Sequence, residues 1–242
     1  MTTVRIFYCV CALFILGDCS KIFREKQDSI FDFLLFAQSW PITGCISWKA
    51  QNTTNFCTLP QNSNVFLIHG LWPTESGTSG PNFCRRWLRF DRKVLNPILD
   101  QMMNRWTNIQ GGTDSYSFWG HEWKKHGTCA ITLAQFNTEY KYFKNSLDLN
   151  LKYDLVNALA EYGIVPGPQQ YTVDNFIDAI VKKYGKIPQI HCTLYNGESL
   201  LDEIRLCFDT SIKLIDCTLV KVNPRACSSK NMIKYLKTVS DD

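Results

Sequence analysis

Long apolar runs are scarce in this 242-residue chain, and none approaches the roughly 20 residues that a membrane-spanning helix needs. Eleven apolar residues from Ile6 to Leu16 follow the early charge of Arg5 and precede the short segment GDCS at residues 17–20. This pattern predicts a signal peptide over about residues 1–20. A buried N-terminal helix is the alternative. We therefore expect a secreted protein that is not embedded in a membrane.

The chain also lacks Cys-x-x-Cys pairs, which disfavours the paired zinc clusters and redox motifs built on that spacing. Eight cysteines follow the predicted signal peptide, and an even number in an oxidising compartment predicts four disulfides. Their spacing does not specify the pairing. The eight are Cys45, Cys57, Cys84, Cys129, Cys192, Cys207, Cys217 and Cys227.

No Pro/Ser-rich linker, repeat or low-complexity tract divides the sequence, so we expect a single domain over residues 21–242. The formal net charge of +4 favours an anionic partner such as nucleic acid, although many proteins with this charge bind none. Asn52 begins an Asn-Thr-Thr glycosylation sequon, which predicts an exposed loop.

Hydrophobic patterns predict the order of the elements. An apolar strand over residues 31–40 stops at Pro41, and the polar, cysteine-containing residues 44–64 are interpreted as a disulfide-tied loop or hairpin. A second buried strand covers residues 65–68. A core-facing helix spans residues 91–106, with Pro97 near its first turn.

The second half begins with helices. Thr132 and Gln135 have the spacing of a capping box, before an apolar stripe of Phe136, Tyr140, Phe143 and Leu147. Further helices are predicted over residues 151–163 and from Thr172 to Gly185. Alternating strands follow over residues 204–208 and 212–216. This order predicts an α+β fold with a mainly antiparallel sheet.

Residues 118–129, which read FWGHEWKKHGTC, have an unusual density of titratable groups. We interpret residues 120–127 as a helix turning about 100° per residue, in which His121 and Lys125 fall at about 0° and 40°. Glu122 and His126 fall at about 100° and 140° on the same face. Aromatic neighbours would hold this face against a core, so we interpret it as an acid–base site. An amphipathic helix with solvated charges is the alternative.

The spacing of the two histidines argues against a zinc site. In His-Glu-x-x-His the metal ligands are four residues apart and lie one above the other on a helix. His121 and His126 are five apart and diverge by about 140° at that pitch. Acid–base chemistry is therefore the better interpretation.

Residues 66–73, which read FLIHGLWP, place His69 at the mouth of a buried strand, before Gly70 and a turn at Pro73. For such a histidine a structural role is the alternative to a catalytic one. Trp72 could be a core residue or a platform on which a base stacks. We interpret His191, beside Cys192, as structural.

Taken together, residues 66–73 and 118–129 resemble the two active-site segments of the T2 ribonuclease family. The resemblance extends to residues 31–41, the eight cysteines and the C-terminal region, and within the family it is greatest to the S-RNases of plant styles. It implies a central antiparallel sheet flanked by helices. It also implies the bridges Cys45–Cys57, Cys84–Cys129, Cys192–Cys227 and Cys207–Cys217.

The resemblance further implies an endoribonuclease for single-stranded RNA that needs no metal or other cofactor and acts as a monomer. His69 and His126 would be the acid–base pair, with Trp72 at the base site. Supporting roles for the phosphate and the charged transition state would belong to His121, Glu122 and Lys125. Many family members have Asp after the Pro of the first segment, where this chain has Thr74, so a base preference tied to that carboxylate is not expected to carry over.

An S-RNase would act in pistil self-incompatibility and meet pollen F-box proteins. One alternative is an S-like ribonuclease with the same chemistry, used in phosphate scavenging or defence. Another is a secreted storage or binding protein without activity, which would be recognised by the loss of a catalytic histidine. Both His69 and His126 are present.

Overall fold

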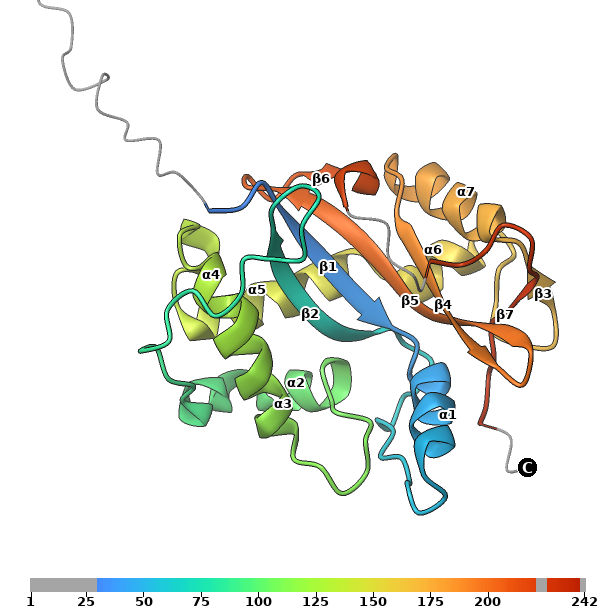
Figure 1. Ribbon diagram of the computed structural model, residues 1–242, viewed down its shortest axis with the longest axis horizontal. Coiled ribbons are helices and arrows are strands. Elements are labelled where there is room, and N and C mark those ends of the chain that lie inside the picture. The colour runs from blue at the N-terminus through green and yellow to red at the C-terminus, as the bar shows by residue number, and fades with distance from the viewer. Residues whose placement is uncertain (1–29, 221–225, 240–242) are drawn as a thin grey trace, which may run out of the picture.

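The computed structural model describes residues 30–220 and 226–239, and the predicted signal peptide lies outside this part of the chain. A curved sheet runs through the middle of the molecule with helices around it (Figure 1). Its strands follow the order β2-β1-β5-β7-β3, with β4 and β6 also paired to β5. All pairs are antiparallel except β5 with β7. The predicted α+β class with a mainly antiparallel sheet is confirmed.

Three long strands position the site. They are β1 (Phe33–Ser39), β2 (Leu67–Thr74) and β5 (Glu198–Asp209). The central strand β5 alternates, so Ile204, Leu206 and Phe208 enter the main core on one face of the sheet. Glu203 and Arg205 point to the opposite face, which is therefore available for polar groups.

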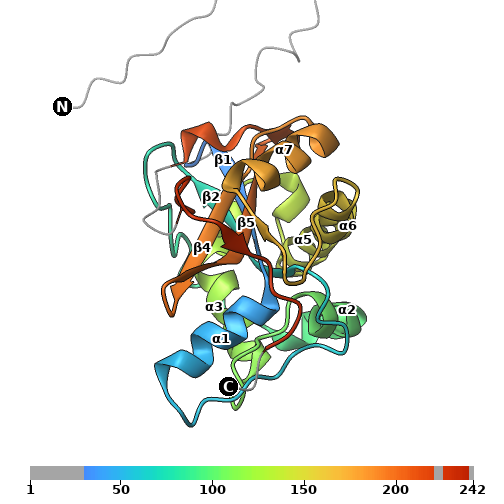
Figure 2. The same ribbon diagram turned by 90° about the vertical axis from the view of Figure 1, so that its right-hand side faces the viewer.

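The remaining strands are short or lie beside β5. They are β3 (Gln170–Tyr171), β4 (Gln189–Tyr195), β6 (Leu214–Ile215) and β7 (Ile233–Lys234). Figure 2, turned by 90°, shows α5 and α6 on one side of the sheet and α1 and α3 below it.

Helices and helical turns make up most of the rest. They are α1 (Pro41–Gln51), η2 (Arg92–Ile98), α2 (Leu99–Arg105), α3 (Ser115–Glu122), η3 (Trp123–Gly127), α4 (Thr128–Ala130), η4 (Ala134–Phe136), α5 (Glu139–Lys152), α6 (Leu155–Ala160), α7 (Val173–Tyr184) and η5 (Cys217–Leu219). None of those within the described ranges is long and apolar enough to cross a membrane.

The loop or hairpin predicted for residues 44–64 is wrong in its first part, because residues 44–51 belong to α1. Pro41 ends β1 but also occupies the first turn of α1, where its missing N–H costs no hydrogen bond. Residues after Gln51 do form an irregular loop, held to the helix by the Cys45–Cys57 bridge.

Two predicted helix boundaries are wrong. The long helix begins at Glu139 with Thr138 as its cap, not at Thr132, and Tyr140 is 37% exposed rather than part of the apolar stripe. Pro97 lies inside the 3-10 helix η2, so residues 91–106 are not one α-helix. The capped helix from Thr172 to Gly185 is confirmed, with a capping box between Thr172 and Asn175.

Three other expected elements differ in length. The helix predicted over residues 151–163 is the shorter α6, capped by Asp154. The strand predicted over residues 212–216 is reduced to Leu214–Ile215, because Ile212 has a left-handed φ of 63°. The strand predicted over residues 65–68 continues to Thr74, without a turn at Pro73. Proline is tolerated there because β2 is an edge strand.

Four disulfides join the same pairs that the family resemblance implies. They are Cys45–Cys57, Cys84–Cys129, Cys192–Cys227 and Cys207–Cys217. Two of them hold the polar face of the sheet and its surroundings in place. Cys207–Cys217 ties β5 to η5, and Cys84–Cys129 fastens the loop before η2 to α4.

Candidate active site

His69 occupies an irregularity in β2. Ala37 pairs with Gly70 and Gln38 pairs with Ile68, so His69 is the extra residue of a β-bulge. A bulge redirects a side chain and is frequent beside active sites. His69 thus lies within the strand rather than at its mouth, and its side chain is 40% exposed on the polar face. The indole Nε1 of Trp106 donates to its carbonyl oxygen, which fixes the backbone here.

The partner of His69 is a carboxylate from β5. Nδ1 of His69 lies 2.7 Å from Oε2 of Glu203, which also accepts a 3.0 Å hydrogen bond from the hydroxyl of Ser39. Nε of Arg205 donates to the other oxygen of Glu203 at 2.5 Å. Both carboxylate oxygens of this buried side chain are therefore satisfied.

These contacts set the charges of the pair. Loss of hydration around the ring lowers the pKa of His69, but the Glu203 carboxylate outweighs it and the net shift is upward. Burial opposes ionisation of Glu203, whereas His69 and Arg205 hold its pKa far below the usual range. The contact therefore favours an ionised carboxylate beside a protonated imidazole.

The second histidine comes from a widened helix. After α3 ends at Glu122, residues 123–127 form the π-helical turn η3, in which backbone hydrogen bonds join residues five apart. The single α-helix predicted for residues 120–127 is therefore wrong. Gly127 permits the turn, because a Cβ there would lie 2.3 Å from the ring of Trp123.

The predicted single polar face is divided by burial. Glu122 and His126 are buried, Lys125 is half-buried, and His121 is exposed at the rim. The Phe83 ring lies 6.4 Å from the His121 ring, edge to face. Lys125 accepts a hydrogen bond at its carbonyl oxygen from the backbone N–H of Phe83.

Burial and neighbouring cations keep His126 neutral. Burial, followed by Lys125, His69 and His121, lowers its pKa to about 2. Its Nδ1 atom is buried and has no hydrogen-bond partner among the described residues. The ring is thus held as a neutral base inside the protein.

Trp72 connects the two histidines. Its ring centroid lies 4.9 Å from that of His69 and 5.3 Å from that of His126. The two imidazoles are consequently within about 10 Å of each other. The guanidinium of Arg205 lies 5.1 Å from the Trp72 centroid, a cation–π distance that brings the Glu203 network to the same indole.

Glu122 holds this indole from the helix. Nε1 of Trp72 donates to Oε2 of Glu122 at 2.9 Å, across the position of Gly70. A Cβ on Gly70 would lie 2.1 Å from Nε1 of Trp72 and 2.2 Å from Oε2 of Glu122. Burial raises the pKa of Glu122, although His69 and the Trp72 hydrogen bond oppose the shift. Only glycine fits beneath this contact.

His121 differs from His69 in its charge. Partial burial, then Lys125, His69 and Lys124, lowers its pKa, so this ring is neutral near pH 7. The three histidines therefore differ in the direction of their pKa shifts, because the pKa of His69 is raised and those of His121 and His126 are lowered.

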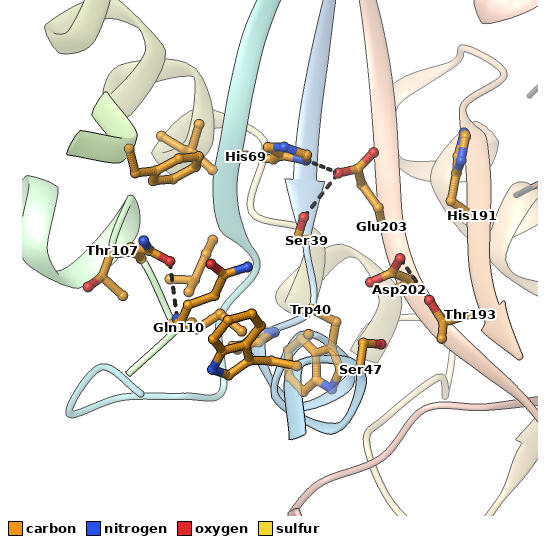
Figure 3. Close-up of a pocket in the computed structure, with 18 of the residues that line it drawn as sticks. Ser39, Trp40, Ser47, His69, Thr107, Gln110, His191, Thr193, Asp202 and Glu203 are labelled. Carbon is orange, nitrogen blue, oxygen red and sulfur yellow. Dashed lines mark hydrogen bonds and ion pairs between the residues drawn. The ribbon is translucent and has the colours of Figure 1, made fainter. Parts of the chain in front are cut away.

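A pocket of about 330 Å³ adjoins His69, and His126 is not among its lining residues. Figure 3 shows His69, Glu203 and Ser39 pointing toward one another at one end, with Trp40 and Ser47 at the other. Asn108, Gln110 and Phe118 contribute to another wall. Among the described residues no group of three His, Cys, Asp or Glu side chains is arranged to hold a metal ion.

Comparison with known proteins identifies the family of this chain. Residues 31–217 match the Ribonuclease T2 family. The chain belongs to that family. It is 32% identical over 210 residues to Ribonuclease Oy of Magallana gigas, covering 85% of this chain and 96% of the relative. It is 36% identical over 186 residues to Ribonuclease T2 of Homo sapiens, covering 76% and 67%.

Solved structures of T2 ribonucleases have the same fold. The crystal structure of RNase NT in complex with 5′-AMP superposes with a TM-score of 0.72 at 30% identity, covering 85% of this chain and 98% of that one. Human RNase T2 gives the same TM-score at 31% identity, with the same coverage. This T2 chain is accordingly a T2-type endoribonuclease.

Three residues of this candidate site were missed by sequence reasoning. Ser39, Glu203 and Arg205 surround the Nδ1 side of His69, but they belong to strands that were interpreted only as packing elements. A signal was present, since Glu203 and Arg205 are successive polar positions of an alternating strand. His191 is buried beside Cys192 in β4, and it lines the pocket rather than the two-histidine centre.

Proposed function

We propose that this T2 ribonuclease cleaves single-stranded RNA by attack of the ribose 2′-oxygen on the adjacent phosphorus, with His126 as general base and His69 as general acid. The observation that carries this assignment is the opposite direction of the two pKa shifts in rings that contact one indole. A base must be free to accept a proton, and an acid must hold one.

The atoms balance without a cofactor. His126 takes the proton of the 2′-hydroxyl, the 2′-oxygen bonds to phosphorus, and the bond to the 5′-oxygen breaks as His69 protonates that oxygen. The products are a 2′,3′-cyclic phosphate and a free 5′-hydroxyl. In a slower second step the roles reverse, and water opens the ring to a 3′-phosphate. Each positioned proton transfer contributes roughly 10²–10⁴-fold to the rate.

Two residues next to His126 would stabilise the five-coordinate phosphorus. The ammonium of Lys125 offsets its extra negative charge, which is effective in a site from which water is excluded. The lowered pKa of His121 favours a neutral ring that donates one N–H to a phosphate oxygen. Glu122 acts through Trp72, which it holds beside both histidines.

Glu203 would be a positioning residue for the acid. By binding Nδ1 of His69, it leaves Nε2 as the nitrogen that faces substrate, and its charge keeps the ring protonated. Ser39 and Arg205 fix the carboxylate in turn.

The substrate would span the polar face of the sheet. Trp72 is proposed to contact one base, and the pocket beside His69 has a volume in the range of small-molecule sites and could take the neighbouring nucleoside. Thr74 is buried, and its hydroxyl donates to the carbonyl oxygen of Trp72, so it offers no carboxylate for base recognition.

Purified protein incubated with single-stranded RNA in EDTA tests the reaction. We expect cyclic phosphate ends first and 3′-phosphate ends later, with no cleavage of single-stranded DNA, which lacks the 2′-hydroxyl. His69→Asn and His126→Asn should each lower the rate at least 100-fold. Intact RNA after treatment with wild-type protein, or near-normal rates for either variant, would show that the assignment is wrong.

The location and the biological role of the enzyme are separate proposals. We propose a secreted, monomeric, single-domain enzyme, with a signal peptide over residues 1–20 and a glycan on Asn52. Asn52 is exposed, as a glycan requires. Within this class the net charge of +4 favours an S-RNase with pollen F-box partners, and an S-like role is the alternative. Mass spectrometry of the secreted protein tests the first proposal. Transcript confined to the style supports the second, and expression elsewhere contradicts it.

A further inference from the structure

The net positive charge of the chain is concentrated in one connection. Residues 84–93, between β2 and α2, contain five cationic side chains and a single carboxylate, Asp91. Their net charge of +4 equals that of the whole 242-residue sequence, so the rest of the chain is neutral on balance. The five cations are Arg85, Arg86, Arg89, Arg92 and Lys93.

An indole projects from the middle of this connection. The backbone N–H of Leu88 donates to the carbonyl oxygen of Arg85, which closes a turn with Arg86 and Trp87 at its tip. Trp87 is 73% exposed, the most exposed large apolar side chain among the described residues. This exposed indole stands between arginines in the sequence, a combination with which proteins hold single-stranded nucleic acid by stacking and charge.

This turn, which we call the Trp87 turn (Arg85–Leu88), is fastened beside the catalytic centre. Cys84, which directly precedes the turn, is bridged to Cys129 of α4, and Cys129 lies two residues after Gly127. Nη1 of Arg85 donates to the carbonyl oxygen of Thr128 at 2.9 Å. Figure 1 shows the connection passing along the outer side of α4 and α3, at the left of the molecule.

The distance to the phosphate site is short. Phe83 lies against His121 and binds the backbone of Lys125. Trp87 follows four residues later, so their Cα atoms are at most about 14 Å apart even in an extended chain. An RNA strand leaving the site past His121 can therefore reach the turn within a few nucleotides.

We propose that the Trp87 turn, with Arg89, is an additional subsite for single-stranded RNA, in which one base stacks on Trp87 and phosphates pair with Arg86 and Arg89. Exposed aromatic rings next to cationic side chains are the usual means by which proteins hold single strands without sequence preference. Arg85 is committed to Thr128, and Arg92 lies over the Tyr116 ring.

Arg86 and Arg89 suit this role because both are exposed and neither forms an ion pair with another described residue. Two acidic residues lie near this turn. Asp91 is close to it in sequence, and Glu139 contacts Asp91. Glu139 accepts from the backbone N–H of Asp91, and burial raises its pKa to about 7, which weakens its negative charge near neutral pH.

The inference rests on the proposed function, so binding is measured apart from cleavage. Fluorescence anisotropy with a labelled single-stranded DNA of about 12 nucleotides reports affinity, because DNA cannot be cut. We expect Trp87→Ala and the double variant Arg86→Gln/Arg89→Gln each to weaken binding about tenfold. The double variant should also reduce the magnitude of the log–log salt slope by about 1.4, at 0.7 for each phosphate contact.

RNA cleavage assays then distinguish an effect on this subsite from an effect on the catalytic centre. On a long single-stranded RNA kcat/KM should fall about tenfold for these variants, whereas on a dinucleoside monophosphate it should equal wild type. Trp87→Phe should retain binding, because a smaller ring can still stack. Lys182→Gln and Lys237→Gln serve as matched charge controls, since Lys182 is on α7 at the opposite side of Figure 1.

Three results would contradict the proposed subsite. Wild-type affinity for the oligonucleotide in both variants would overturn the subsite, whether or not the enzyme cuts RNA. Normal oligonucleotide binding with lost retention on phosphatidylserine vesicles would show that the turn docks on an anionic membrane instead. Equal losses on the dinucleoside and the long RNA would mean that the turn acts on the catalytic centre and not on the strand.

Discussion

Oε2 of Glu203 lies 2.7 Å from Nδ1 of His69, although the two residues are 134 positions apart in the chain. The carboxylate is buried, and it holds the ring by Nδ1, which leaves Nε2 outside this contact. A charge that stabilises an imidazolium raises the pH at which the imidazole loses its proton. This contact therefore fixes both the orientation and the protonation of the proposed acid.

Replacing this carboxylate changes the pH profile. In Glu203→Gln the pKa of His69 should fall, because the charge that raises it is gone, so the alkaline limb of kcat/KM should move to lower pH. At pH 7 we expect a loss of about tenfold or more. Initial rates on a dinucleoside monophosphate across pH 4–9 give the profile.

Ser39→Ala is the control for this effect. It removes one hydrogen bond to Glu203 without removing the charge, so its alkaline limb should stay close to wild type. An unchanged alkaline limb in Glu203→Gln would contradict the role of Glu203, since a purely structural loss lowers the rate without moving the limb.

Gly70→Ala tests the contact between Trp72 and Glu122. The new methyl group would overlap both atoms of that hydrogen bond, so the indole must move away from the histidines. We expect activity to drop at least tenfold and the free energy of unfolding to drop by about 1–3 kcal/mol. Urea denaturation and RNA cleavage give the two quantities.

Gly167→Ala is the matched control for Gly70→Ala. Its Cβ would meet only the end of the Gln169 side chain, at 3.0 Å, so both quantities should stay near wild type. Full activity in Gly70→Ala would mean that the indole position is not important for cleavage.

His126 should make folding sensitive to acid. Its pKa is about 2 in the folded protein and about 6.5 in the unfolded chain, so the unfolded state binds a proton throughout this window. The free energy of unfolding should consequently fall as pH is lowered below about 6.5. His126→Asn lacks this contribution and should gain stability relative to wild type as pH decreases.

Urea titrations at pH 7, 5.5 and 4 measure that difference. His121→Asn is the comparison, because His121 is exposed and a smaller gain is expected. A constant difference between wild type and His126→Asn over this range would contradict the assignment of a neutral, buried His126.

Local sequence patterns predicted the elements with clear periodicity. The strand from Phe31 and the capped helix from Thr172 could be read from apolar spacing and a capping pair. The predicted bounds of the elements were wrong where one residue has two roles. Pro41, for example, ends a strand and starts a helix. The bounds were also wrong at Pro97 and Ile212, where backbone geometry rather than hydrophobicity decides the element.

For the site, the two active-site segments were found because their polar residues are dense and close together in sequence. Glu203 was missed because the neighbours of a residue on a strand can be identified only when the register of the sheet is known. The π-helical turn was missed for a related reason, since its hydrogen bonds depend on Trp123 packing against Gly127. The charges of His69 and His121 likewise depend on neighbours from other elements.

The central place of β5 has a consequence for how this nuclease is made. A growing polypeptide that ends before Glu198 lacks the middle strand of the sheet, and with it the carboxylate that charges His69. His69 and His126 have both been synthesised by then, but the proposed active site that would use them is incomplete. The ribosome, itself built of RNA, has therefore synthesised most of this chain before the proposed active site can assemble.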